Sequence, residues 1–232
     1  GTYGYMCPNN KRLVVALGAG LATGVTTIVD AGSSGWATFI GFKEFIADRS
    51  RTQTLTFVHI SGIGLTYGPI GEMEDLRYGD PERTACVIHN WSDICVGVKV
   101  RQARFQVGDN GVEPLKLANK AADYVGVPVM VHIGAGVPLP NVLAEMRAGD
   151  IVTHCYQGHG DLVIDDAERI LPEVWEARKR AAAEGKAIFL MAGSGGAPAA
   201  GCCTCRWAPP PKVQLVAELA NARQGTASTK TR

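Results

Sequence analysis

The feature that most constrains the fold is a regular alternation of short apolar runs with segments that carry apolar residues at helical spacing. The runs are continuous and rich in β-branched residues, and they start near residues 26, 54, 96, 127, 150 and 186. Continuous apolar runs are typical of parallel strands whose faces are covered by helices. One intervening segment opens with Asp80 and Pro81, the N-cap pattern of a helix that begins with proline. The alternation therefore predicts an α/β fold built on a parallel sheet.

Two α/β architectures fit this alternation, an open doubly wound sheet and a (β/α)8 barrel. The chain has no Gly-x-Gly-x-x-Gly turn after a first strand, which argues against the dinucleotide-binding version of the open sheet. Its polar residues of interest stand at the carboxyl ends of several different strands, which is where barrel enzymes carry their chemistry. We therefore predict an incomplete TIM-type (β/α)8 barrel, with about six of the eight strands present.

Composition and charge argue against several classes of protein. The chain has 232 residues, of which 46% are hydrophobic and 19% charged, as in an ordinary soluble globular protein. A formal net charge of +1 offers no basic surface for nucleic acid. No run of about 20 apolar residues is present, so no membrane span is expected, and no secretory leader pattern opens the sequence. Most of the seven cysteines are scattered among apolar segments, which indicates reduced thiols and a cytoplasmic protein.

The strand and helix pattern ends near residue 192. We expect residues 1–191 to form one partial barrel. Residues 192–232 are rich in Gly, Ala, Pro and Cys, and we expect an irregular C-terminal segment with a short helix at 213–222.

Three residues suited to a metal site lie on consecutive apolar runs: Lys99 within one run, and His132 and His154 at the ends of the next two. Taken singly, each has an ordinary structural explanation, such as a lysine whose head reaches water or a core histidine bonded to the backbone. In a parallel barrel, however, strand ends converge on one mouth. Neutral imidazole is a common zinc ligand, and a lysine carboxylated by CO2 can bridge two metal ions. The combination indicates a metal site, and a two-metal site would generate hydroxide at neutral pH and polarise a scissile carbonyl.

Four segments, taken together and in order, resemble the metal-dependent amidohydrolase superfamily, in particular its dihydroorotase-like amidohydrolase/deacetylase branch. These segments are 24–32 (GVTTIVDAG), 97–101 (GVKVR), 128–134 (PVMVHIG) and 149–155 (GDIVTHC). The resemblance covers roughly residues 1–190. It implies a (β/α)8 barrel with one or two zinc ions. In that barrel Lys99 matches the carboxylated bridging lysine, and His132 and His154 match the histidines after the fifth and sixth strands. The implied reaction is attack of a metal-bound hydroxide on an amide, cyclic amide or acyl ester of a small molecule.

The sequence departs from this superfamily in two places. The His-x-His pair of the family's first strand is absent, and the sequence begins where the residues just after that pair would lie. The family's general-base aspartate after the eighth strand is also absent, and the segment from about residue 192 resembles a frameshifted end. We therefore expect impaired catalysis by this chain, without an identified catalytic base.

Several other polar residues have two explanations each. Arg101 lies two positions beyond Lys99 on the same strand face, where it would bind a substrate carboxylate or pair with an acid at the mouth. His159 is a candidate for substrate contact or for simple exposure in a loop. Asp30 would orient a metal ligand or cap a turn, and His59 would contact substrate or serve as a buried structural histidine.

Two other interpretations remain beside the zinc hydrolase. One is a catalytically inactive or truncated family member, and the other is an α/β binding protein without metal, in which the lysine and histidines are incidental. For partners we expect a small-molecule substrate, with no nucleic acid and no membrane. An incomplete barrel leaves apolar strand edges open, so we also expect marginal stability or association into homo-oligomers.

Overall fold

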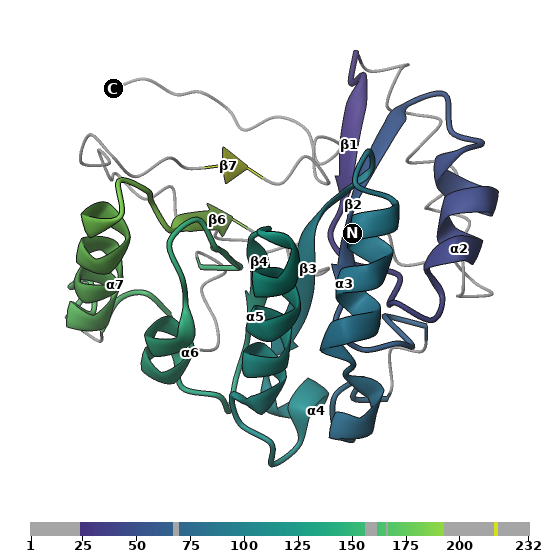
Figure 1. The fold of residues 1–232 in the computed structure, drawn as a ribbon. Helices are drawn as coiled ribbons and strands as arrows, with labels where there is room; N and C mark the ends of the chain where they lie inside the picture. The colour runs from purple at the N-terminus through teal and green to yellow at the C-terminus, as the bar shows by residue number, and fades with distance from the viewer. Residues whose placement is uncertain (1–23, 67–69, 156–161, 166, 193–215, 218–232) are drawn as a thin grey trace.

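The structure is a computed structural model, and it describes residues 24–66, 70–155, 162–165, 167–192 and 216–217 of the chain. These residues form a parallel sheet with helices on its outer face (Figure 1). The strands are β1 (Thr27–Asp30), β2 (Gln53–His59), β3 (Cys95–Gln102), β4 (Val129–Ile133), β5 (Ile151–Thr153), β6 (Phe189–Ala192) and β7 (Val216–Ala217). They follow each other across the sheet in chain order, and every neighbouring pair is parallel. The predicted α/β class and the six predicted strands are therefore confirmed.

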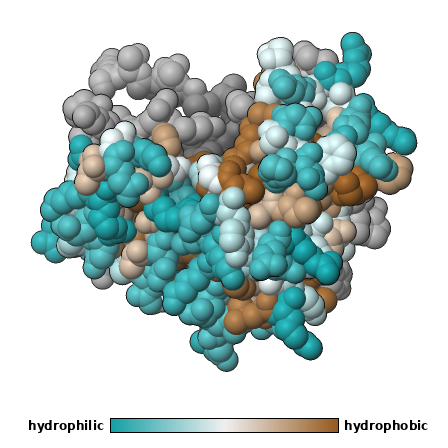
Figure 2. Space-filling model, viewed as in Figure 1, coloured by the Kyte–Doolittle hydropathy of each residue, from teal (hydrophilic) through white to brown (hydrophobic). Residues whose placement is uncertain are grey.

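The helical segments lie between the strands, as the alternation predicted. They are α2 (Phe39–Phe42), the π-helix η1 (Lys43–Ala47), the 3-10 helix η2 (Leu76–Tyr78), α3 (Pro81–Asn90), α4 (Arg104–Val107), α5 (Glu113–Val125), α6 (Leu139–Glu145) and α7 (Pro172–Ala183). The carboxylate of Asp80 accepts a hydrogen bond of 3.0 Å from the backbone N–H of Arg83, so the predicted N-cap of α3 is confirmed. The outward side of this helical layer is mainly hydrophilic (Figure 2).

Strand β7 differs from the sequence expectation. It lies inside the segment predicted to be irregular and within the range where a short helix was expected, at residues 213–222. Its two residues pair with Met191 and Ala192 of β6. The backbone at Val216 and Ala217 thus extends the sheet, and the helix prediction is wrong there. Pairing with an open strand edge supplies a constraint that local helical spacing does not contain.

The two faces of the sheet bury different sets of residues, because successive side chains of a strand point to opposite faces. Val98, Val100 and Val131 belong to the large core beneath the helices. On the inner, concave face, Phe57 and Met130 form a smaller buried cluster. On the inner face, the polar residues near the ends of these strands therefore lie next to this apolar cluster.

A buried carboxylate joins the amino ends of β4 and β5. Asp150 is 1% exposed, and its two oxygens accept hydrogen bonds from the backbone N–H groups of Val129 (2.8 Å) and Arg147 (2.7 Å). The guanidinium of Arg147 also bonds to both Asp150 oxygens and to the carbonyl of Val127. Arg147 has a second acidic partner, Asp123, whose side chain is 66% exposed. The network thus ties β4 and β5 together at their amino ends.

No helix in the described ranges is long and apolar enough to cross a membrane.

This network predicts unequal effects for two Asp-to-Asn substitutions at the same arginine. Asp150→Asn replaces an acceptor with a donor and leaves a buried N–H without a partner, so we expect a loss of about 2–4 kcal/mol in the free energy of unfolding. Asp123→Asn removes an exposed ion pair and should change that free energy by less than about 1 kcal/mol. Urea unfolding measures both, and equal losses would contradict the role given to Asp150.

Candidate metal centre

Strand register sets which polar side chains share the carboxyl end of the sheet. His59 of β2 is paired with Lys99 of β3, and Arg101 of β3 is paired with His132 of β4. His132 is paired in turn with Thr153, the last residue of β5. Lys99 is 4% exposed and Arg101 8% exposed. Four neighbouring side chains that can carry positive charge are thus placed at one end of the sheet.

The structure brings His132 and His154 into direct contact. Their ring centroids are 4.3 Å apart and the rings meet edge to face, at 71°. His154 directly follows β5 and has a left-handed backbone, with φ of 69°. A non-glycine residue rarely adopts this conformation. The turn takes His154 out of the strand's regular alternation and beside the ring of its neighbour.

His132 is held in the neutral form that a metal requires. Burial lowers its pKa well below the usual value of 6.5, and the charges of His154, Lys99 and Arg101 lower the pKa further. A neutral imidazole keeps a ring nitrogen available as a ligand.

Lys99 is packed closely by the loop that follows β1. Gly32 in that loop has φ of +85°, and a Cβ at this position would lie 2.3 Å from Cβ and 2.4 Å from Cγ of Lys99. Only glycine fits both this conformation and this contact. The lysine stem is therefore held between the loop and the neighbouring strands.

These residues fit part of a metal site. Within the part of the chain that the structure describes, no three His, Cys, Asp or Glu side chains are grouped as metal ligands. The two imidazoles in contact would supply two ligands to a metal ion, and Lys99 would become a third ligand only as a carboxylated side chain. As an ammonium group, Lys99 instead opposes a cation at this place.

Arg101 pairs with an acid that the sequence analysis did not identify. Its Nε donates to Oε1 of Glu72 at 2.6 Å and its Nη2 donates to Oε2 at 2.5 Å. Glu72 is 2% exposed. Burial alone would raise its pKa, but contacts with His59 and hydrogen bonds from Arg101 lower the pKa to about 2. Of the two roles expected for Arg101, the structure shows pairing with an acid, and substrate binding stays a prediction.

His59 belongs to the same buried group. Its Nδ1 accepts a hydrogen bond of 3.0 Å from the backbone N–H of Ser61. The ring proton is therefore on Nε2, which lies 3.3 Å from Oε1 of Glu72. Burial is the main cause that lowers the pKa of His59. A neutral, fully buried ring fits the structural role of the two that were expected.

Two candidates remain: Asp30, which the structure describes, and His159, which it does not. The fully buried carboxylate of Asp30 accepts hydrogen bonds from the backbone and the hydroxyl of Ser33, at 2.8 and 2.7 Å, and from Thr56 at 3.1 Å. Burial nevertheless raises its pKa. The expected turn-capping role is present, and an influence of Asp30 on a metal ligand stays a prediction. His159 lies outside the described residues.

Known proteins share both sequence and fold with this chain. Proteins named deacetylase are 39% identical over 182 residues in Agrobacterium fabrum and 38% identical over 182 residues in Brucella anthropi. Each comparison covers 77% of this chain and 43% of the relative. An Enterococcus faecalis deacetylase is 35% identical over 161 residues, 68% of this chain and 43% of the relative. No family model matches the chain.

Two solved structures extend the comparison to the fold. An adenine deaminase superposes with a TM-score of 0.66 at 33% identity and a dihydroorotase with a TM-score of 0.64 at 35% identity. Both matches cover 74% of this chain, and they cover 45% and 46% of the two neighbours. The chain thus spans less than half the length of these proteins. Its six parallel strands form the curled half-barrel of an amidohydrolase-like fold, and the predicted incomplete TIM-type barrel is confirmed.

The contact between Gly32 and Lys99 predicts a difference between two glycine substitutions. Gly24 has φ of +82°, close to that of Gly32, but nothing lies within 4 Å of a Cβ there. Gly24→Ala should lower the free energy of unfolding by about 1–2 kcal/mol through backbone strain alone. Gly32→Ala should lower it by about 1–3 kcal/mol more, because it also overpacks the lysine stem. Equal losses in urea unfolding would show that Lys99 is not packed against this loop.

The lowered pKa of His132 predicts how stability depends on pH. A histidine that resists protonation in the folded state binds more protons when unfolded, so metal-free protein should lose stability as the pH falls below about 6.5. Replacing His132 with glutamine should reduce this loss. Two-dimensional NMR of the imidazole groups checks the cause directly, since the His132 signal should remain neutral at pH 6. Titration of that signal near its ordinary value would contradict the structure.

Proposed function

We propose that this chain is part of a zinc-dependent hydrolase of the amidohydrolase superfamily, from its dihydroorotase-like amidohydrolase/deacetylase branch. The reaction proposed is hydrolysis of an amide, cyclic amide or acyl ester of a small molecule. One observation carries the proposal: Lys99 lies in β3, His132 lies near the end of β4 and His154 directly follows β5, and the two imidazole rings are in contact. The names of the relatives, deacetylase and dihydroorotase, support the reaction class.

The metal would be held by His132, His154 and carboxylated Lys99. A bound zinc ion supplies a Lewis acid that polarises a carbonyl and lowers the pKa of water. Burial contributes to this arrangement, because it keeps His132 neutral and ready to bind. His132 lies on β4 and His154 directly follows β5, so the pairing of the two strands and the turn at His154 together set the separation of the rings.

As an ammonium group Lys99 repels a metal ion, but by reacting with CO2 it would become a metal ligand. Its neutral amine nitrogen forms a bond to the carbon of CO2 and releases a proton, which gives an anionic carbamate. The change removes a positive charge from a side chain that is 4% exposed. It also supplies two oxygen atoms that can bridge a pair of metal ions.

The activity of the whole protein goes beyond what this chain contains. The comparisons cover 43–46% of the relatives and neighbours. The sequence has neither the first-strand His-x-His pair nor the eighth-strand aspartate that the resemblance implies. We therefore propose that this chain alone binds metal and hydrolyses substrate slowly at best.

Metal binding by the full chain tests this proposal. We expect zinc to bind in the presence of bicarbonate, and His132→Ala or His154→Ala to weaken binding by at least about tenfold, since each removes an imidazole ligand. His89→Ala is the matched control, because His89 is an exposed histidine on α3. With 13C-bicarbonate, NMR should show a carbamate signal that disappears in Lys99→Arg. Zinc well below one per chain, or an equal effect of all three alanine variants, would refute the site.

A further inference from the structure

Glu72 is a buried acid whose carboxylate lies against two basic residues of the inner sheet face, Arg101 and His59. It accepts two hydrogen bonds from Arg101, and its Oε1 lies 3.3 Å from Nε2 of His59. These two partners come from adjacent strands, β3 and β2, at positions beside Lys99. One carboxylate thus joins the ends of two strands next to the proposed metal centre.

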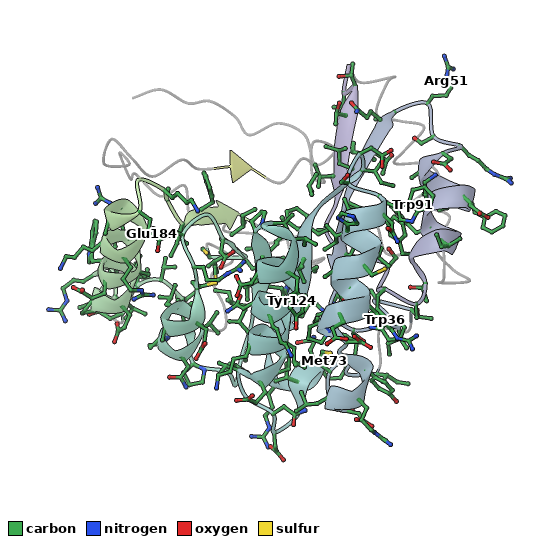
Figure 3. All side chains as sticks on the ribbon, in the orientation of Figure 1. Trp36, Arg51, Met73, Trp91, Tyr124 and Glu184 are labelled. Atoms are coloured by element: carbon green, nitrogen blue, oxygen red, sulfur yellow. The ribbon has the colours of Figure 1, made fainter. Side chains whose placement is uncertain are left out.

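The loop that carries Glu72 is itself firmly anchored. The N–H of Met73 donates to the carbonyl of Gln106 at 2.9 Å, and the side chain of Asn110 donates to the carbonyls of Met73 and Glu74. Met73 is fully buried, where α3 and α5 begin (Figure 3). The Glu72 carboxylate is therefore held in place from the loop side as well as from the strand side.

The electric field around His132 shows why this carboxylate matters. Arg101 is paired across the sheet with His132, and Lys99 lies two residues before Arg101 on the same strand face, so both place positive charge beside His132. A divalent cation at the two imidazoles would experience the same repulsion, doubled by its charge. Carboxylation would remove the contribution of Lys99, but a guanidinium stays charged at every ordinary pH. Arg101 therefore needs a permanent counter-charge if metal is to bind beside it.

We propose that Glu72 is a positioning residue for the metal centre, which neutralises Arg101 and holds its guanidinium against the loop. This inference rests on the proposed function, because it concerns affinity for the same metal. On this proposal Arg101 has a structural role at the carboxyl end of the sheet, where it forms a fixed bidentate pair with Glu72. A purely structural ion pair would affect folding stability and leave zinc affinity unchanged among the variants that fold.

Zinc affinity and stability, measured separately on the full chain, distinguish these roles. Glu72→Gln keeps the shape of the side chain and removes its charge, so zinc affinity should fall by at least about tenfold, as expected for a unit charge facing a divalent ion at low effective dielectric constant. Glu74→Gln is the matched control, since Glu74 is exposed in the same loop, and its zinc affinity should match that of the unaltered chain. Affinity is measured by competition with a chelator, and stability by urea unfolding without zinc.

The double variant Glu72→Gln/Arg101→Gln provides the sharper comparison. It removes both charges, so zinc affinity should return to within about threefold of the unaltered chain, even though the ion pair is lost. Affinity in the double variant as low as in Glu72→Gln would overturn the proposal. Glu72→Asp covers the case in which Glu72→Gln does not fold, because it keeps the charge. It should bind zinc within about tenfold of the unaltered chain, and a larger loss would also overturn the proposal.

Failure of this inference is distinguishable from failure of the proposed function. If the unaltered chain binds no zinc, both are wrong. If it binds zinc and Glu72→Gln binds equally well, only the role of Glu72 is wrong.

Discussion

The parallel register of β3 on its neighbours is the constraint on which the site depends. Side chains alternate between two buried faces, so a slip of one residue would place Lys99 and Arg101 among the helices and turn Val98 and Val100 toward the mouth. The apolar packing beneath α3 and α5 therefore also fixes the chemistry at the strand ends. The same packing holds the imidazoles of His132 and His154 in contact. Folding stability and the proposed metal binding therefore both depend on this one strand.

Among the described residues, three buried carboxylates each have specific partners. Asp150 joins the amino ends of two strands through Arg147 and two backbone N–H groups. At the carboxyl end, Asp30 is bonded by Ser33 and Thr56, and Glu72 by Arg101. The two ends differ in consequence. At the amino end the Asp150 network joins neighbouring strands, whereas basic groups gather at the carboxyl end, where we propose that the charge state of Lys99 decides whether a cation is repelled or bound.

Local sequence signals predicted the framework well. Continuous apolar runs marked the six strands, and the Asp80–Pro81 pair marked the start of α3, because both depend on residues close together in the chain. The choice of Lys99 and the two histidines followed from their place on successive strands. Glu72 could not be predicted, since it lies in a loop 29 residues before Arg101 and no local pattern joins them. The left-handed backbone at His154 was equally hidden, because it is imposed by the surrounding fold.

The central proposal is that Lys99, His132 and His154 share a metal. Diffraction from crystals of the full chain grown with zinc and bicarbonate, recorded on both sides of the zinc absorption edge, tests it most directly. We expect an anomalous peak about 2.1 Å from a nitrogen of each of the two imidazole rings, with density for a carboxylate on Lys99. Peaks confined to exposed side chains, with an unmodified Lys99, would contradict it.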